Sequence, residues 1–150
     1  MSVHRRRIDT IRAIVAGNPA IGGSGSSAAI DTEFQEAMRA RAVWRKRRRE
    51  LLEVLHCTRA LDSALKAFTT HHNCCPSPPA LGRYLYSLKN HTSATLTGRL
   101  SQSEIGRFKT SVIDPRNRLM HEADAYPVSD AEILILLSEM QDCLTLVLSL

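Results

Sequence analysis

Aromatic residues are scarce in this sequence, which has three phenylalanines, three tyrosines and one tryptophan among 150 residues. No stretch alternates apolar and polar residues convincingly enough to predict a β-strand. The core must therefore consist mostly of leucine, isoleucine, valine and alanine, which favours helices. Apolar residues make up 43% of the chain, close to the average for globular domains. We expect residues 1–150 to form a single all-α domain that is long enough to fold without disulfide bonds or structural metal ions.

Long apolar runs are also missing. No stretch reaches the roughly 18 residues needed for a membrane span, and no hydrophobic segment followed by a small-residue cleavage site marks a signal peptide. We therefore expect a cytoplasmic protein with no membrane partner. Reduced thiols are then expected for Cys57, Cys74, Cys75 and Cys143.

Convincing metal and cofactor motifs are missing as well. Residues 71–75, HHNCC, have the residue types of a metal site, but adjacent Cys74 and Cys75 cannot easily chelate one zinc ion together with adjacent histidines. Residues 23–28, GSGSSA, match a dinucleotide-binding loop by letters but follow a predicted helix instead of a strand. We expect no metal and no cofactor.

Positive charge, in contrast, is present in excess. The net charge is +5, and residues 41–50, RAVWRKRRRE, include five consecutive basic residues. Because arginine forms bidentate contacts with phosphate and tryptophan can stack on a base, this segment is a candidate RNA-binding surface. The candidate residues are Trp44, Arg45, Arg47, Arg48 and Arg49. Two alternatives are contact with the acidic surface of a partner protein and an ordinary solvated helix face.

Apolar periodicity predicts an all-α bundle of four to six helices with one long basic helix. The predicted helices cover residues 4–16, about 31–70, about 80–88, 101–113 and 129–148, with capping-box patterns at Ser101 and Ser129. A flexible loop rich in glycine and serine is expected at 17–30, and another loop at 124–128. The last helix is so apolar that it must lie centrally or form a dimer interface.

Residues 114–124, DPRNRLMHEAD, could carry chemistry. Arg116 and His121 are separated by about 7.5 Å along a helix axis and about 140° around it, so only a curled arginine side chain would bring them together. Asn117 lies one turn before His121. A histidine can transfer protons at a ribose 2′-oxygen and an arginine can stabilise the phosphate. From the residues alone, a charged helix start, with Asp114 as its cap and Pro115 in its first turn, is the competing interpretation.

Residues 116–121, RNRLMH, resemble the R-N-x-x-x-H motif of the HEPN superfamily. The preceding helix, the short loop and the apolar closing helix are similar too, so the resemblance covers about residues 100–148. It implies a small all-α domain, a homodimer in which two motifs face one cleft, and catalysis by Arg116 and His121 with Asn117 as polar companion. HEPN toxins paired with minimal nucleotidyltransferases often have a tyrosine two residues after the histidine. Here that residue is Ala123, so control by nucleotide transfer to it is not expected.

The resemblance implies a metal-independent endoribonuclease of a toxin–antitoxin or phage-defence system. Its expected partners are RNA, a second copy of the chain and a neutralising antitoxin or regulatory protein. The alternative is a catalytically silent helical module that binds nucleic acid or a partner protein through Arg39–Arg49, because some HEPN domains are not catalytic.

Overall fold

A computed structural model of the chain describes residues 1–127 and 129–150, so Val128, the last residue of the expected loop 124–128, lies outside the described residues. Over the described residues the chain is all-helical and contains no strand, as the sequence predicts. Its helices are α1 (Val3–Gly17), α2 (Pro19–Gly22), α3 (Ser27–Ala40), α4 (Lys46–His71), α5 (Leu81–Asn90), α6 (Gln102–Phe108), α7 (Asp114–His121) and α8 (Asp130–Leu148), and a π-helix, η1 (Lys109–Ile113), joins α6 to α7.

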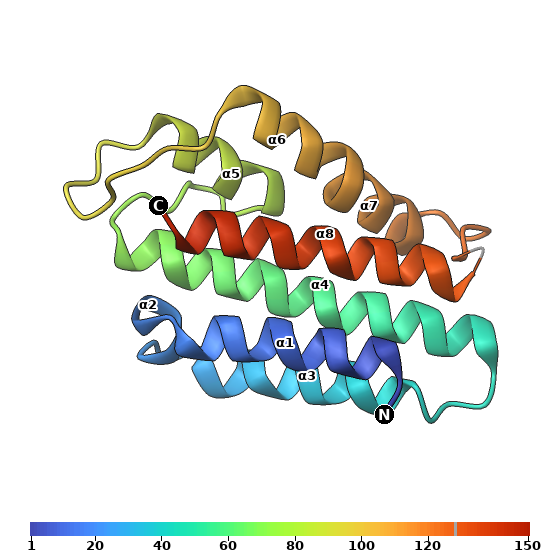
Figure 1. Ribbon diagram of the computed structural model, residues 1–150. Coiled ribbons are helices and arrows are strands. Elements are labelled where there is room, and N and C mark those ends of the chain that lie inside the picture. Colours follow the sequence, from blue (N-terminus) through green and yellow to red (C-terminus); the bar gives the residue numbers. More distant parts are fainter. Residues whose placement is uncertain (128) are drawn as a thin grey trace.

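The helices pack around α4, the longest of them (Figure 1). Helices α1 and α3 lie along one side of α4, whereas α5 and the rod α6–η1–α7 lie on the other. Helix α8 packs against α1, α4 and η1 and so connects the two sides. The backbone N–H groups of Thr97 and Gly98 donate to the carbonyl oxygen of Leu150, which fixes the C-terminus to the α5–α6 connection.

The predicted single long helix over residues 31–70 is wrong, because the chain reverses at residues 41–45. Helices α3 and α4 run antiparallel and pack along their length (Figure 1). Arg41 at the reversal is held by Glu53 of α4 and Asp130 of α8, at 3.0 and 3.3 Å. The reversal buries the apolar stripe of α3, including Phe34, against the rest of the bundle.

The predicted flexible loop 17–30 is also largely replaced by helix. The side chain of Asn18 accepts a hydrogen bond from the N–H of Ala20, and Pro19 follows at the first helical position, so a one-turn helix forms. Helix α3 then begins at Ser27, which leaves only residues 23–26 as a connection. The connection is short because Ile21 and Ile30, on either side of it, are buried.

Pro115 is accommodated without a break in the helical rod. The N–H of Asp114 donates to the carbonyl oxygen of Lys109, five residues earlier, which is the hydrogen-bond pattern of a π-helix. The expected side-chain cap by Asp114 is not formed, and its carboxylate instead accepts from Lys109 Nζ at 3.0 Å. Helix α7 is therefore a continuation of α6 and η1. The capping box at Ser101 and Glu104, in contrast, forms as predicted.

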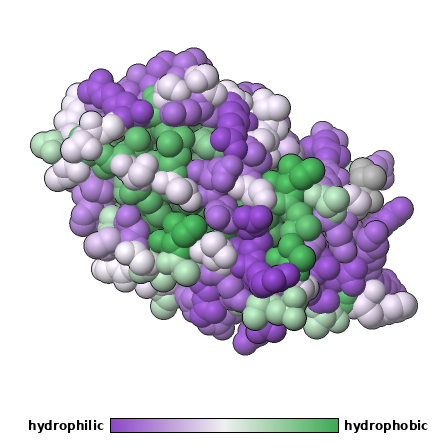
Figure 2. Space-filling view, viewed as in Figure 1, coloured by the Kyte–Doolittle hydropathy of each residue, from purple (hydrophilic) through white to green (hydrophobic). Residues whose placement is uncertain are grey.

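The core is mainly aliphatic, as the composition predicts, with Phe34, Phe68, Tyr84 and Phe108 as its buried aromatic residues. Helix α8 is central, and it buries Ile133, Leu136, Leu137, Met140, Cys143, Leu144 and Val147. Each fully buried large aliphatic side chain contributes about 1.5–3 kcal/mol. On the face shown in Figure 2, apolar side chains form areas separated by hydrophilic ones. None of the helices within residues 1–127 and 129–150 has the length and apolar character to cross a membrane.

Candidate functional site

Three residues of α7 form a polar cluster near the C-terminal end of the rod. Arg116 Nη1 lies 2.9 Å from Asn117 Oδ1 and 3.5 Å from His121 Nε2. The sequence predicted that Arg116 and His121 could meet only through a curled arginine side chain, and the structure has this arrangement. Arg116 is half-buried, whereas Asn117 and His121 are exposed. The predicted catalytic residues are therefore together within one chain.

The geometry of the Arg116–His121 pair restricts the protonation of the imidazole. A guanidinium has only hydrogen-bond donors, so Nε2 can interact favourably with it only through its lone pair. The proton of a neutral imidazole then lies on Nδ1, and Nε2 is the atom able to accept a proton. At 3.5 Å the contact with His121 is at the outer limit of a hydrogen bond, so the hydrogen bond of 2.9 Å to Asn117 Oδ1 is the one that mainly holds Arg116 Nη1.

Neither member of this pair is held in an ion pair among the described residues. Arg118, the next arginine of α7, lies 2.8 Å from Glu132 of α8. Two other histidines, His4 and His56, each lie 2.7 Å from a buried or half-buried glutamate. These residues support the fold, whereas the described partners of Arg116 and His121 are each other and the neutral side chain of Asn117.

A small pocket of about 250 Å³, the Arg116 pocket, lies beside this cluster between α4, the start of α5 and the rod. Asp62 of α4 lines it opposite Arg116 and Asn117. Burial raises the pKa of Asp62, while the charges of Arg116 and Lys66 act in the opposite direction. Sequence reasoning missed Asp62. The sequence signal that could have identified Asp62 is the position of an acidic residue directly next to Leu61, in the apolar part of α4.

The basic segment lies at the start of α4 and does not form the middle of a long helix. Trp44, 86% exposed, occupies the reversal between α3 and α4. Arg45, Arg47 and Arg48 are exposed, but Arg49 is half-buried and its Nε atom is buried without a hydrogen-bond partner among the described residues. The structure thus brings together three of the four predicted RNA-binding arginines and turns Arg49 away from them.

A groove of about 700 Å³, the α4–α7 groove, connects this basic segment to α7. Its basic rim consists of Arg45, Lys46, Arg47 and Arg48. Its apolar floor consists of Leu51, Leu52, Leu55, Leu119 and Met120. Tyr126 completes the lining, and the guanidinium carbon of Arg47 lies 4.9 Å from the centroid of its ring. Sequence reasoning identified most of the rim but not the floor.

The α4–α7 groove and the Arg116 pocket follow one another along the same two helices. On α4, Leu55 of the groove and Asp62 of the pocket are seven residues apart and so share a face. On α7, Met120 of the groove is four residues after Arg116 of the pocket. The basic rim and Arg116 therefore lie along one path between α4 and α7, whereas His121 is in the described lining of neither the groove nor the pocket.

The electrostatics at the start of α4 are unfavourable for the isolated helix. Arg45 occupies the N-cap position without a side-chain cap, and the first turn has basic residues but no acidic one. Cations at the positive end of a helix dipole are destabilising by roughly 0.3–1 kcal/mol each. The arrangement concentrates positive charge at this helix start, and Glu50, 3.8 Å from Lys46 Nζ, offsets it only in part.

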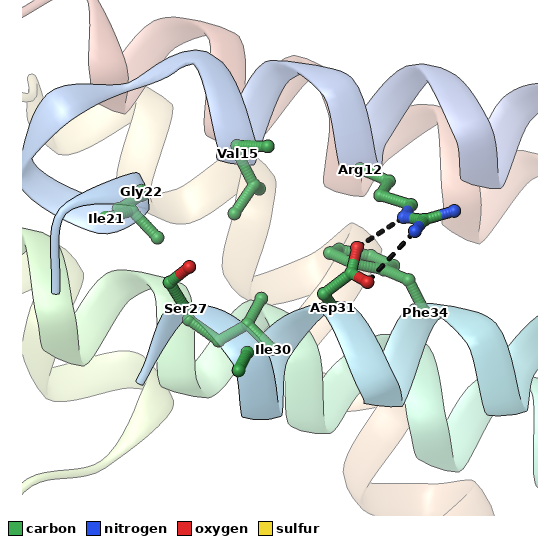
Figure 3. A pocket seen from close by; sticks show the side chains of 10 residues that line it. Arg12, Val15, Ile21, Gly22, Ser27, Ile30, Asp31 and Phe34 are labelled. Atoms are coloured by element: carbon green, nitrogen blue, oxygen red, sulfur yellow. Dashed lines mark hydrogen bonds and ion pairs between the residues drawn. The ribbon is translucent and has the colours of Figure 1, made fainter. Parts of the chain in front are cut away.

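Of the remaining pockets, the one lined by Lys46, Arg47, Glu50 and Asp124 adjoins the basic rim and contains the predicted residue Arg47. A pocket of about 290 Å³ between α1, α2 and α3 is lined mainly by apolar side chains, and Arg12 and Asp31 bond to each other at its edge (Figure 3). At residues 71–75, His72 Nδ1 lies 2.7 Å from Thr95 Oγ1. In the part of the chain that the structure describes, no group of three or more histidine, cysteine or acidic side chains is placed to hold a metal ion.

Comparison of the chain with protein-family models, curated proteins and solved structures finds no match.

Proposed function

We propose that the protein is a metal-independent endoribonuclease of HEPN type, acting as a toxin or a phage-defence effector. The proposal depends on one observation above all: Arg116 Nη1 lies 3.5 Å from His121 Nε2, and no described carboxylate forms an ion pair with either residue. The continuity of α7 with η1 supports it further. Because α7 has no free N-terminus, the competing interpretation of residues 114–124 as a charged helix start loses its structural basis.

In the proposed reaction, a ribose 2′-hydroxyl attacks the adjacent phosphorus. His121 Nε2 accepts the hydroxyl proton as the bond between the 2′-oxygen and phosphorus forms. Arg116 donates hydrogen bonds to the phosphate and stabilises its developing charge. The bond to the 5′-oxygen then breaks, and this oxygen receives a proton. The products are a 2′,3′-cyclic phosphate and a 5′-hydroxyl.

One imidazole supplies only one of the two proton transfers. The proposal therefore includes a homodimer in which a second copy of the motif supplies the other. Asn117 has a supporting role, because its side-chain oxygen lies 2.9 Å from Arg116 Nη1 and restricts the guanidinium. The rim residues Arg45, Arg47 and Arg48, together with exposed Trp44, would bind the RNA strand beyond the cleavage site.

The test is cleavage of single-stranded RNA in EDTA by the wild type, His121→Ala and Arg116→Ala. Loss of general acid–base catalysis is expected to lower the rate by about 10²- to 10⁴-fold. Matched controls are His71→Ala and Arg99→Ala, which change exposed residues outside both pockets. DNA of the same sequence should remain intact because it has no 2′-hydroxyl. Equal cleavage by the wild type and His121→Ala, or no cleavage by either, would refute the proposal.

A second candidate is a catalytically silent module that binds through the basic segment. It is favoured by the concentration of Arg45, Lys46, Arg47 and Arg48 at the rim of one groove. If this is the whole function, His121→Ala leaves all activity of the protein unchanged, whereas charge reversal at Arg45, Arg47 and Arg48 abolishes binding. Binding that survives this charge reversal would exclude the module.

A further inference from the structure

The α4–α7 groove has a floor that RNA binding does not explain. Leu51, Leu52, Leu55 and Met120 offer aliphatic and thioether surface. None of the groove's described lining residues is an asparagine, glutamine, serine, threonine or histidine that could read the edge of a base. Its aromatic residue, Tyr126, already has Arg47 over its ring. The floor is therefore suited to apolar side chains more than to nucleobases.

The rim determines the charge of the occupant. Four consecutive cations at the start of α4 line the groove together with the floor, and the described lining contains no acidic residue. The uncapped start of α4 adds its positive potential to theirs. An occupant that covers the floor must therefore present carboxylates to the rim.

The form of the floor suggests the form of the occupant. Grooves between two helices bind amphipathic helices, which insert apolar residues at i, i+3, i+4 and i+7. Met120 adds an adaptable side chain of the kind found where peptides dock.

We propose that the α4–α7 groove binds an acidic amphipathic helix of a partner protein. Its apolar face covers Leu52, Leu55 and Met120, and its carboxylates pair with Arg45, Arg47 and Arg48. Since the same arginines would hold RNA, the bound helix excludes RNA and inhibits cleavage. Peptide binding is independent of the nuclease proposal, and only the inhibition rests on it.

The probe is a fluorescent 16-residue helical peptide of leucine and glutamate, with its leucines along one face. A peptide of the same composition without a leucine face serves as a control, and a 12-nucleotide single-stranded RNA is the competing ligand. We expect fluorescence anisotropy to show micromolar binding of the amphipathic peptide to the wild type and at least tenfold weaker binding of the control peptide.

Two groove variants and one matched variant distinguish the contribution of the floor to binding from that of the rim. Leu52→Gln/Met120→Gln should weaken peptide binding at least tenfold and leave RNA binding unchanged. Arg47→Glu/Arg48→Glu should weaken the binding of both ligands. Arg6→Glu/Arg99→Glu, with the same change in net charge at exposed positions outside the groove, should affect peptide binding less than twofold. Circular dichroism verifies that each variant folds, and Leu55→Ala replaces the floor variant if it does not.

Two results would overturn the inference. The first is equal affinity for the amphipathic and control peptides, or a loss of affinity in the groove variants no larger than in the matched variant. The second is a floor variant that loses affinity for RNA but not for peptide, which would identify the groove as a nucleotide site. Peptide binding without RNA cleavage by the wild type would refute the nuclease proposal alone, whereas cleavage without peptide binding would refute this inference alone.

Discussion

Glu33 of α3 and His56 of α4 are joined by a 2.7 Å contact between Glu33 Oε2 and His56 Nδ1. In one continuous helix these residues would be about 35 Å apart, because each residue advances the axis by about 1.5 Å. Arg59, one turn after His56, lies 2.9 Å from the other oxygen of the same carboxylate. The contacts show that the chain reverses between α3 and α4, and that polar groups as well as apolar ones hold the two helices together.

A double-mutant cycle with Glu33→Gln and His56→Gln tests this relationship. Both side chains are less than one-fifth exposed, so we expect a coupling of about 1 kcal/mol in urea denaturation at pH 6. A control cycle of His56→Gln with Asp142→Asn, on α8, should give a coupling near zero because the two residues share no partner. Absence of coupling between Glu33 and His56 would contradict the antiparallel packing.

The buried carboxylate of Glu53 provides a second prediction. Glu53 is 0% exposed, and its two oxygens lie 2.7 Å from His4 Nδ1 and 3.0 Å from Arg41 Nη1. Arg41 also contacts Asp130, so one network connects α1, α4, the α3–α4 reversal and the start of α8. Replacing Glu53 by glutamine leaves the charge of half-buried Arg41 only partly compensated.

We expect Glu53→Gln to lower the free energy of unfolding by about 3 kcal/mol, as is usual when one partner of a buried ion pair is removed. Urea denaturation should show a lower midpoint with an unchanged slope. The control is Glu122→Gln, at an exposed position, which should change stability by less than about 0.5 kcal/mol. A loss for Glu53→Gln as small as that of the control would mean that the network does not stabilise the fold.

The buried carboxyl group of Glu50, which is 1% exposed, is expected to destabilise the fold, unlike that of Glu53. Burial raises the pKa of its carboxyl group above the ordinary value, although Lys46 at 3.8 Å opposes the shift. A raised pKa means that the ionised group costs stability above the folded-state pKa. Below the unfolded-state pKa, near 4.5, the group is protonated in both states and the cost disappears.

Glu50→Gln should therefore stabilise the protein at pH 7 by about 1 kcal/mol. The difference from the wild type should shrink as the pH falls toward 4. Thermal unfolding of both proteins at pH 7, 5.5 and 4 measures it. A difference that stays constant with pH would show that the carboxyl group does not titrate differently in the folded and unfolded states.

The sequence signal for the α3–α4 reversal is the angular phase of the apolar residues around the helix axis. No turn residue marks it. Residues 41–45 include neither glycine nor proline, so no local breaker marks the turn. In an uninterrupted helix, however, Phe34 and Leu61 would lie on roughly opposite sides, given about 100° per residue. Two apolar stripes out of phase predict two helices that fold back on each other. The length of the apolar pattern favours one helix, whereas its phase favours two.

The candidate site was predictable only where its residues are close in sequence. Arg116 and His121 belong to one helix, so their spacing alone raised the possibility of contact. Asp62 and the apolar floor come from α4, and their position opposite α7 depends on how the helices pack. The continuity of α7 through Pro115 was equally hidden, because a π-helix has no sequence pattern comparable to a capping box.

The N-cap position of α4 provides the last prediction. Arg45 has the extended backbone of an N-cap, with φ −75° and ψ 108°, but it offers no side-chain acceptor to the free N–H groups that follow. Aspartate at this position would accept from them and would also interact favourably with the helix dipole. We expect Arg45→Asp to raise the free energy of unfolding by about 1 kcal/mol.

The same substitution should weaken RNA binding at least tenfold, because it replaces a cation of the groove's rim by an anion. Arg45→Ala separates the two effects, since it removes the cation without supplying a cap and should weaken binding with little gain in stability. Urea denaturation and fluorescence anisotropy with a 12-nucleotide RNA measure the two quantities. If Arg45→Asp raises the free energy of unfolding and lowers the affinity for RNA, Arg45 binds an anion at the expense of the stability of this helix start. If Arg45→Asp raises stability and leaves RNA binding intact, the basic rim does not bind RNA.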